Sequence, residues 1–381
     1  MKRREIIASA GAVALGAGTL GALTRTAPLE TSKGPKRSDL ASPALSKNRR
    51  EFRLATSWPK DFPGLGIMPV NIAKLVKEMS DGRLDIKVFA AGELVGALEC
   101  FGATSTGAAD MYHAAEYYWQ GKVKGFSFFT AVPMGMTATE LMGWIDHGGG
   151  QDLWDDLSAQ FNIKAFQAGN TGHQTGGWFK KEIKSVEDFR GLKMRMPGLG
   201  GDVLREIGAA AINLPGGEIY QSLQSGAIDA TEWVGPWNDL AFGFYREAPY
   251  YYAPGFHEPG ASLAFGVNID VWNSLSASDQ AIIKYACKAT NDLSIGEYTY
   301  RNAVALNTLR NEHNVAPRTL PDDALRAIGK ASLDVLAGMA NADSTTAKIY
   351  TSFAENLKLQ REWTEMSEGA FIRARTLSDS R

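Results

Sequence analysis

Arg195 and Glu232 are the two charged residues whose sequence neighbours make them candidates for binding chemistry. Arg195 alternates with Met194 and Met196, so in an extended segment its side chain lies on the face opposite the methionines. One interpretation is a solvated sheet edge; the other is a guanidinium fork that holds a carboxylate through two parallel hydrogen bonds. Glu232 stands in the apolar segment 230–234, where a carboxylate is costly unless it is paired or faces water. The residues alone leave these alternatives open.

Glu258 is a third candidate, 258 − 232 = 26 positions beyond Glu232, although a carboxylate in such a turn is usually a surface group. No complete catalytic motif accompanies these three candidate residues in the sequence. Neither a G-x-S-x-G elbow nor a Walker loop occurs in the sequence. The five histidines fall in no zinc-binding spacing: His113, His147, His173, His257 and His313.

A partial dinucleotide fingerprint is present at residues 198–201, which read Gly-Leu-Gly-Gly. An acidic residue, Glu218, follows 218 − 200 = 18 positions beyond Gly200, but Val203 stands where the third glycine belongs. We interpret the segment as a tight strand-to-helix turn. An exported NAD-dependent oxidoreductase remains the alternative from another function class.

The composition indicates an ordinary globular chain. Of 381 residues, 44% are hydrophobic and 22% are charged, which suits two domains with sizeable cores. The formal net charge is −2 and no basic block runs through the body, so the sequence indicates no nucleic-acid partner. Cys100 and Cys287 match no metal or redox spacing; two separate buried thiols are the preferred interpretation over a disulfide.

The elements that must position these residues alternate between strands and helices, which predicts an α/β fold. The expected strands cover 52–56, 84–89, 111–114, 126–132, 163–167, 177–180, 192–196, 210–214 and 230–234. The expected helices include 70–79, one opening at Thr137 with a capping box to Glu140, 202–207, and 217–224 with Gly226 as its stop.

The last third of the chain is helical in pattern. Ser276 and Asp279 suit a helix start, and no proline occurs between Pro259 and Pro317, so one unusually long helix is expected. Nearer the end, apolar residues form a helical stripe: Ile349, Phe353, Leu357 and Trp363. Docking of this stripe onto the core is preferred over a partner-binding face.

Four motifs in family order give the chain a recognisable resemblance. They lie at 82–94, 133–136, 188–195 and 223–230, and read GRLDI followed by VFAAGEL, PMGM, DFRGLKMR and LQSGAIDA. The sequence resembles the solute receptors of tripartite ATP-independent periplasmic (TRAP) transporters, the DctP-like family, over about residues 52–272. These motifs disfavour a receptor of the ABC type, which is the alternative that keeps the fold.

The resemblance implies a two-lobed periplasmic binding protein fold with crossing hinge strands and a long inter-lobe helix, and no enzymatic activity. Lobe 1 is expected to comprise 51–172 and 261–300. Lobe 2 is expected to comprise 173–260 and 301–381, including the C-terminal helices. The lobes of such receptors close over their ligand by a hinge motion.

The resemblance also implies the ligand and the residues that bind it. The family arginine that holds the ligand carboxylate falls on Arg195. Trp233 stands where many members, including sialic-acid receptors, have Asn, so the chain resembles the branch that binds 2-oxo or 2-hydroxy monocarboxylates, such as pyruvate or lactate, together with a metal ion. The matching metal positions are Gln174, Glu232, the Trp233 carbonyl and Glu258.

A bound cation makes sense of two glutamates beside an anionic ligand, because it reverses the local repulsion. Oxygen ligands predict a hard ion, calcium or sodium. The pocket walls are expected to be aromatic, with an ordinary core position as the alternative for each candidate. These candidates are Trp58, Tyr117, Tyr118 and Trp178.

The N-terminus predicts export. Arg3 and Arg4 precede a mildly apolar stretch in a pattern similar to a twin-arginine signal, although Glu5 follows the pair and no clean A-x-A cleavage site appears. We expect an export signal at 1–27, a linker at 28–50, and a periplasmic receptor that passes its ligand to TRAP membrane subunits. A monomer or a homodimer both fit the sequence.

Overall fold

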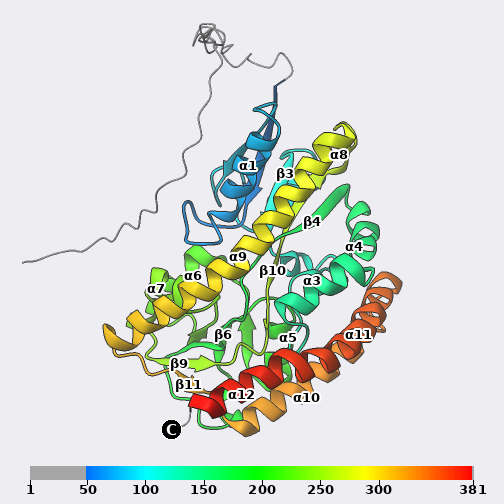
Figure 1. Ribbon diagram of the computed structural model, residues 1–381. Helices are drawn as coiled ribbons and strands as arrows, with labels where there is room; N and C mark the ends of the chain where they lie inside the picture. The colour runs from blue at the N-terminus through cyan, green and yellow to red at the C-terminus, as the bar shows by residue number, and fades with distance from the viewer. Residues whose placement is uncertain (1–48, 380–381) are drawn as a thin grey trace, which may run out of the picture. The chain divides into compact units, whose positions relative to one another are not determined.

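The computed structural model describes residues 49–379, which contain two β-sheets (Figure 1). The first sheet has the order β2-β1-β3-β10-β4. Its strands are β1 (Arg50–Thr56), β2 (Leu84–Phe89), β3 (Met111–Ala114), β4 (Ile163–Asn170) and β10 (Ser262–Asn268). The second sheet has the strand order β11-β9-β5-β8-β6-β7. Its strands are β5 (Gly177–Phe179), β6 (Lys193–Arg195), β7 (Ala210–Ile212), β8 (Ala230–Thr231), β9 (Tyr250–Ala253) and β11 (Arg318–Thr319).

Both sheets are mixed, and helices cover them. Parallel pairs such as β1–β2 and β6–β8 carry helical crossovers, while β10 is antiparallel to both β3 and β4. On the first sheet lie α1 (Met68–Met79), α2 (Cys100–Ser105), α4 (Gly150–Ala159) and α8 (Ile269–Asn273), and α3 (Ala138–His147) packs on α4. On the second lie α5 (Gly198–Glu206), α6 (Gly216–Ser225) and α7 (Pro236–Phe242). The predicted two-lobed α/β fold is thereby confirmed.

Local sequence signals explain several element boundaries. Thr137 and Glu140 form the expected capping box at the start of α3. Gly226 ends α6 with φ of 77°, a left-handed conformation that favours glycine. The proline-free stretch forms one helix of 35 residues, α9 (Ala277–Asn311). At its start, the Ser276 hydroxyl accepts a hydrogen bond from the backbone N–H of Asp279.

The strand predicted at 126–132 is wrong. Its first four residues belong to a 3₁₀ helix, η3 (Lys124–Phe129), in which Phe126, Phe128 and Phe129 are all fully buried, and residues 130–132 are in neither a helix nor a strand. A run that is apolar on every side is compatible with a buried strand or a buried helix, because no periodicity distinguishes them. The other short turns of helix are η2 (Glu116–Trp119), η4 (Val186–Phe189) and η5 (Phe244–Arg246).

Two segments cross between the sheets side by side, and this arrangement positions the site. Residues 171–176 lead from β4 to β5, and residues 254–261 lead from β9 to β10. Backbone hydrogen bonds join them, including Gln174 N–H to the Glu258 carbonyl at 3.2 Å and Gly255 N–H to the Gln174 carbonyl at 3.0 Å. Helix α9 contacts α1, β4 and α7, and so packs on elements of both sheets.

The C-terminal helices are α10 (Asp322–Met339), α11 (Ser344–Thr364) and α12 (Ala370–Asp379), with a π-helical turn, η6 (Glu365–Gly369), between the last two. Helix α10 packs on α5 of the second sheet, whereas α11 packs on η3, α3 and α4, which belong to the first sheet's layer. The lobe boundaries predicted above stay a prediction, and the contacts of α11 favour the first lobe for this helix rather than the second.

The two cysteines are confirmed as separate buried thiols. Within residues 49–379, no helix has both the length and the apolar character needed to cross a bilayer. The predicted export signal at 1–27, and the linker at 28–50 apart from its last two residues, lie outside the described residues.

Glu116 is a buried carboxyl group that makes stability depend on pH. Its Oε1 accepts hydrogen bonds from the Tyr112 hydroxyl (2.7 Å) and the Trp154 indole (3.1 Å), and burial raises its pKa from 4.5 to about 7. The folded protein therefore keeps a proton that the unfolded chain releases. The resulting stabilisation is fully present below pH 4.5 and is lost as the pH rises through about 7.

The Glu116→Gln variant should lack this part of the pH dependence. Between pH 4.5 and 7, we expect the unfolding free energy of the unmodified protein to fall by about 3 kcal/mol more than that of the variant. Urea unfolding at four or five pH values measures both curves. Parallel curves would show that Glu116 ionises normally in the folded protein.

Candidate functional site

Arg195 and Glu232 form a buried ion pair at the centre of the site. Strand β6 lies beside β8 with Arg195 opposite Thr231, and this register brings the guanidinium next to the following residue, Glu232. Arg195 Nη1 contacts Glu232 Oε1, and both side chains are 1% exposed. The same nitrogen donates to the Glu232 carbonyl (3.2 Å), and Nε donates to the Leu214 carbonyl (3.3 Å). Arg195 is therefore not at a solvated sheet edge.

One guanidinium nitrogen of Arg195, with its two N–H donors, is left over. This nitrogen, Nη2, is buried and has no hydrogen-bond partner among residues 49–379. The guanidinium also lies over the Trp233 ring, 5.0 Å from the ring centroid, which adds a favourable cation–π contact. An unpaired buried donor costs free energy, so an acceptor atom brought to Nη2 would be bound favourably.

The second oxygen of Glu232 contacts a residue that the sequence did not single out. His257 Nε2 lies 3.2 Å from Glu232 Oε2, and His257 is 2% exposed. Burial lowers the pKa of His257, but the hydrogen bond and the charge of Glu232 raise it more, so the net shift is upward. Its position next to Glu258 was the one available signal, and an isolated histidine in a turn does not reveal a partner 25 residues earlier.

Gln174 and Glu258 meet where the two crossing segments lie side by side. Gln174 Nε2 donates to Glu258 Oε2 at 2.7 Å and to the Thr171 hydroxyl at 3.0 Å. Gln174 Oε1 is buried without a partner among the described residues. Burial, together with the nearby charge of Glu232, raises the pKa of Glu258 from 4.5 to about 7. Glu258 is thus a buried group at 2% exposure rather than a surface turn residue.

A small cavity lies between the two sheets beside this cluster, and Arg195, Glu232 and His257 are not among the residues that line it. Its free volume of about 10 Å³ has room for roughly one water molecule. Gln174 and Glu258 line it together with aromatic and apolar side chains and one threonine: Trp58, Leu65, Tyr117, Tyr118, Thr171, Trp233, Val234, Ala261 and Leu263. Burial raises the pKa of Tyr118 to about 12, so its hydroxyl stays neutral at physiological pH.

Trp178 is the candidate wall residue that the structure places elsewhere. Its ring stacks on Tyr251 with centroids 4.0 Å apart, and its indole N–H donates to Asp239 at 2.9 Å. It belongs to the core beneath the site and is not among the residues that line the cavity.

The glycine-rich turn at 198–201 lies beside the site and serves close packing. A Cβ atom on Gly198 would come within 3.1 Å of the Tyr117 ring, and one on Gly200 would come within 2.7 Å of the His257 Cβ. The glycines let the first turn of α5 approach these side chains. The interpretation as a tight strand-to-helix turn therefore accounts for them without a nucleotide.

The donor set fits a hard cation. One ligand atom each from Glu232, His257 and Glu258 can be chosen so that all lie within 4.8 Å of one another. Gln174 Oε1 supplies a further buried oxygen with no other partner among residues 49–379. Two carboxylates and an amide oxygen suit calcium or sodium.

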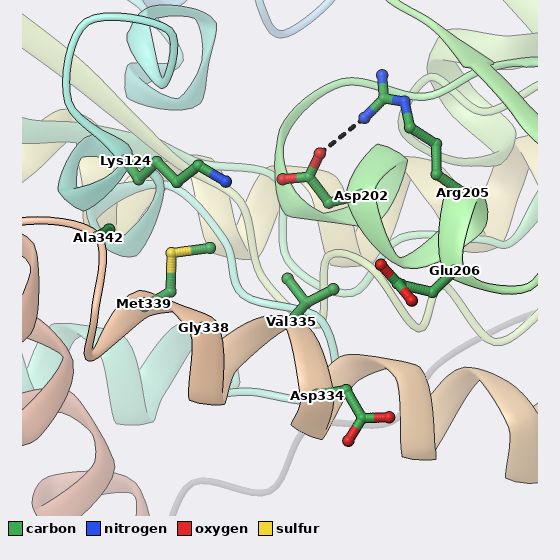
Figure 2. Close-up of a pocket in the computed structure, with 9 residues that line it drawn as sticks. All are labelled: Lys124, Asp202, Arg205, Glu206, Asp334, Val335, Gly338, Met339 and Ala342. Atoms are coloured by element: carbon green, nitrogen blue, oxygen red, sulfur yellow. Dashed lines mark hydrogen bonds and ion pairs between the residues drawn. The ribbon is translucent and has the colours of Figure 1, made fainter.

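A larger groove lies at the surface between η3, α5 and α10, with a volume of about 460 Å³ (Figure 2). Its charged side chains have both signs, and Arg205 already pairs with Asp202 at 2.7 Å. None of the predicted binding residues lines this groove. The buried cavity is therefore the better candidate for a small anionic ligand.

Two helix-covered β-sheets joined by crossing segments, with a buried cluster of charged side chains and a small cavity between them, define a two-lobed solute-binding protein. The family model for bacterial extracellular solute-binding proteins, family 7 (DctP), matches residues 54–343. The chain belongs to this family. Its members are receptors rather than enzymes, so the alternative of an oxidoreductase is wrong.

Individual relatives agree with this assignment. The chain is 39% identical to the monocarboxylate 2-oxoacid-binding periplasmic protein of Nostoc sp. (strain PCC 7120), over 97% of each chain. A TRAP periplasmic solute-binding protein from Pseudoalteromonas atlantica, solved with bound sodium and pyruvate, is 43% identical with a TM-score of 0.83, covering 85% of this chain and 99% of that one. One from Colwellia psychrerythraea, solved with calcium and pyruvate, is 42% identical with a TM-score of 0.83, covering 86% and 99%.

Proposed function

We propose that this protein is the extracytoplasmic receptor of a TRAP transporter and binds a small 2-oxo or 2-hydroxy monocarboxylate, pyruvate or lactate being the simplest, together with calcium or sodium. The observation that carries the proposal is a buried arginine with a spare donor beside two buried glutamates. A lone anion site needs no carboxylates, and a lone cation site needs no arginine. Both charges together suit a ligand anion bound next to a cation.

The ligand carboxylate would bind Arg195 through Nη2 and a second guanidinium nitrogen. Gln174, Glu232, Glu258 and the Trp233 carbonyl would hold the cation, which supplies positive charge to the ligand's second oxygen. Trp58, Tyr117, Tyr118 and Trp233 would wall the ligand and keep water out, which strengthens each electrostatic contact. The cavity as it stands has room for roughly one water molecule, so the surrounding side chains would have to move apart to admit even a small acid.

The protein would work in the periplasm and deliver its ligand to TRAP membrane subunits. Residues 1–27 would direct export and be removed. Crossing segments between lobes suit a hinge that opens the cavity for exchange.

The assembly state is predicted as monomer or homodimer, and the C-terminal helices favour the homodimer. Their outward faces carry apolar side chains that are more than 60% exposed: Leu333, Leu359, Trp363, Met366, Phe371 and Leu377. A groove of about 410 Å³ with an apolar floor, lined by Leu336, Phe353 and Leu357 among others, lies beside them. A second copy of the chain would supply apolar helices of matching character.

Native mass spectrometry of protein exported by its own signal tests these points in one measurement. We expect added mass equal to one small organic acid plus one calcium or sodium ion per chain, on a chain lacking its first residues. Complexes of two chains would support the homodimer. Protein that carries no ligand and gains none from millimolar pyruvate or lactate with calcium would contradict the assigned ligand class.

A further inference from the structure

The ion pair between Arg195 and Glu232 occupies the groups that the ligand and the cation would use. Nη1 of Arg195 contacts Oε1 of Glu232, and Oε2 of Glu232 faces His257 at 3.2 Å. Both carboxylate oxygens of Glu232 are therefore engaged by cationic or potentially cationic side chains. Each of the three side chains is 1% exposed, so water screens these contacts little.

We propose that the Arg195–Glu232 pair is an internal substitute for ligand and cation, and that only the two together replace it. This inference rests on the proposed function. A carboxylate that takes both terminal nitrogens of Arg195 must displace Glu232. A cation that binds Glu232 must draw it away from Arg195. Glu232 thus exchanges its arginine partner for the cation while Arg195 exchanges its glutamate for the ligand.

Binding of the ligand anion alone, or of the cation alone, would leave a buried charge without a partner. An anion alone would release Glu232 beside Glu258, with only His257 to compensate two carboxylates. A cation alone would leave Arg195 unpaired next to an added positive charge. Removing one partner of a buried ion pair is strongly destabilising, so each single-component state is disfavoured. Together they replace one ion pair by two, which couples the two binding events.

Glu258 provides a matched control because it is a second buried carboxyl group of the same cluster with a different partner. Its Oε2 accepts from the neutral Gln174 amide at 2.7 Å, and no ion pair joins it to Arg195. Glutamine at either position replaces one carboxyl group of the cluster by an amide. Neutralising Glu232 alone also frees Arg195.

The first test measures pyruvate affinity by calorimetry in chelated, sodium-free buffer. We expect Glu232→Gln to bind pyruvate without a cation at least tenfold more tightly than the unmodified protein does, and Glu258→Gln to improve by less than threefold. Equal improvement in both variants, or none in Glu232→Gln, would overturn the internal substitute while leaving the receptor assignment standing. Cation-independent binding in the unmodified protein would instead overturn the proposed cation function.

The second test changes Arg195 instead of Glu232. It tests the same proposal if the Glu232→Gln variant does not fold. Calcium is titrated into protein without any organic acid. Arg195→Gln releases Glu232, so we expect calcium alone to bind this variant at least tenfold more tightly than the unmodified protein. Unchanged calcium affinity in a folded Arg195→Gln variant, judged by circular dichroism, would overturn the proposal.

Discussion

Replacing Arg195 by alanine is expected to weaken pyruvate binding in the presence of calcium by between about tenfold and a hundredfold. The variant loses a charge-assisted, two-pronged contact of the kind that contributes about 1.5–3 kcal/mol, and each 1.4 kcal/mol is roughly tenfold in affinity. The Arg195→Lys variant should also bind pyruvate more weakly, because one ammonium group cannot make the two parallel hydrogen bonds of a guanidinium. Titration calorimetry measures all three proteins.

Arg205→Ala is the matched control for this prediction. Arg205 lies on α5, about half exposed, and pairs with Asp202 in the surface groove of Figure 2. Its loss should leave pyruvate affinity unchanged. The alanine variant at 195 should also unfold at a lower temperature, since Glu232 is then buried without its partner. Full affinity in a folded Arg195→Ala variant would remove the residue from the ligand site.

Removing every metal ion is expected to lower pyruvate affinity at least tenfold. Glu232 and Glu258 belong to one buried cluster, and the raised pKa of Glu258 reflects burial and the charge of Glu232. A cation would neutralise these two charges and so allow an anion to bind beside them. The expected factor lies within the range of 5–150-fold, about 1–3 kcal/mol, that is typical of coupling between two ligands.

The measurement compares pyruvate titrations after chelation and dialysis into sodium-free buffer with titrations after calcium or sodium is restored. Calcium should restore affinity somewhat better than sodium, because its double charge offsets two carboxylates. Coupling is reciprocal, so pyruvate should raise the affinity for calcium by the same factor by which calcium raises the affinity for pyruvate. Identical pyruvate affinity in all three buffers would mean that Arg195 holds the ligand without a metal.

Local sequence patterns determined most of the secondary structure, because capping, turns and side-chain alternation act over a few residues. The strand at 84–89 was predicted with its observed bounds, the capping box of Thr137 and Glu140 was confirmed, and the lack of proline correctly indicated the single helix α9. The segment at 126–132 failed because its side chains are buried on all sides, which removes the periodicity that a prediction needs.

The sequence also determined the family, since four motifs between residues 82 and 230 resemble it in order and the family model matches residues 54–343. Without the family resemblance, the residues themselves did not decide whether Arg195 lies at a solvated sheet edge or contacts a ligand. They indicated that Glu258 is a surface residue in a turn. Tertiary structure shows that both side chains are buried in one polar cluster. The neighbouring positions of β6 and β8 bring Arg195 to Glu232, and the paired crossing segments bring Glu258 to Gln174.

Two side-chain roles were decided by tertiary packing alone. His257 contacts Glu232, and Trp178 stacks on Tyr251 in the core instead of walling the cavity. Such contacts join residues that are 25 to 73 positions apart, the latter being 251 − 178 = 73. Strand order and register set them, and these depend on how whole faces pack. A sequence pattern reports which side chains share a face, whereas the buried partner across the sheet is set by the fold as a whole.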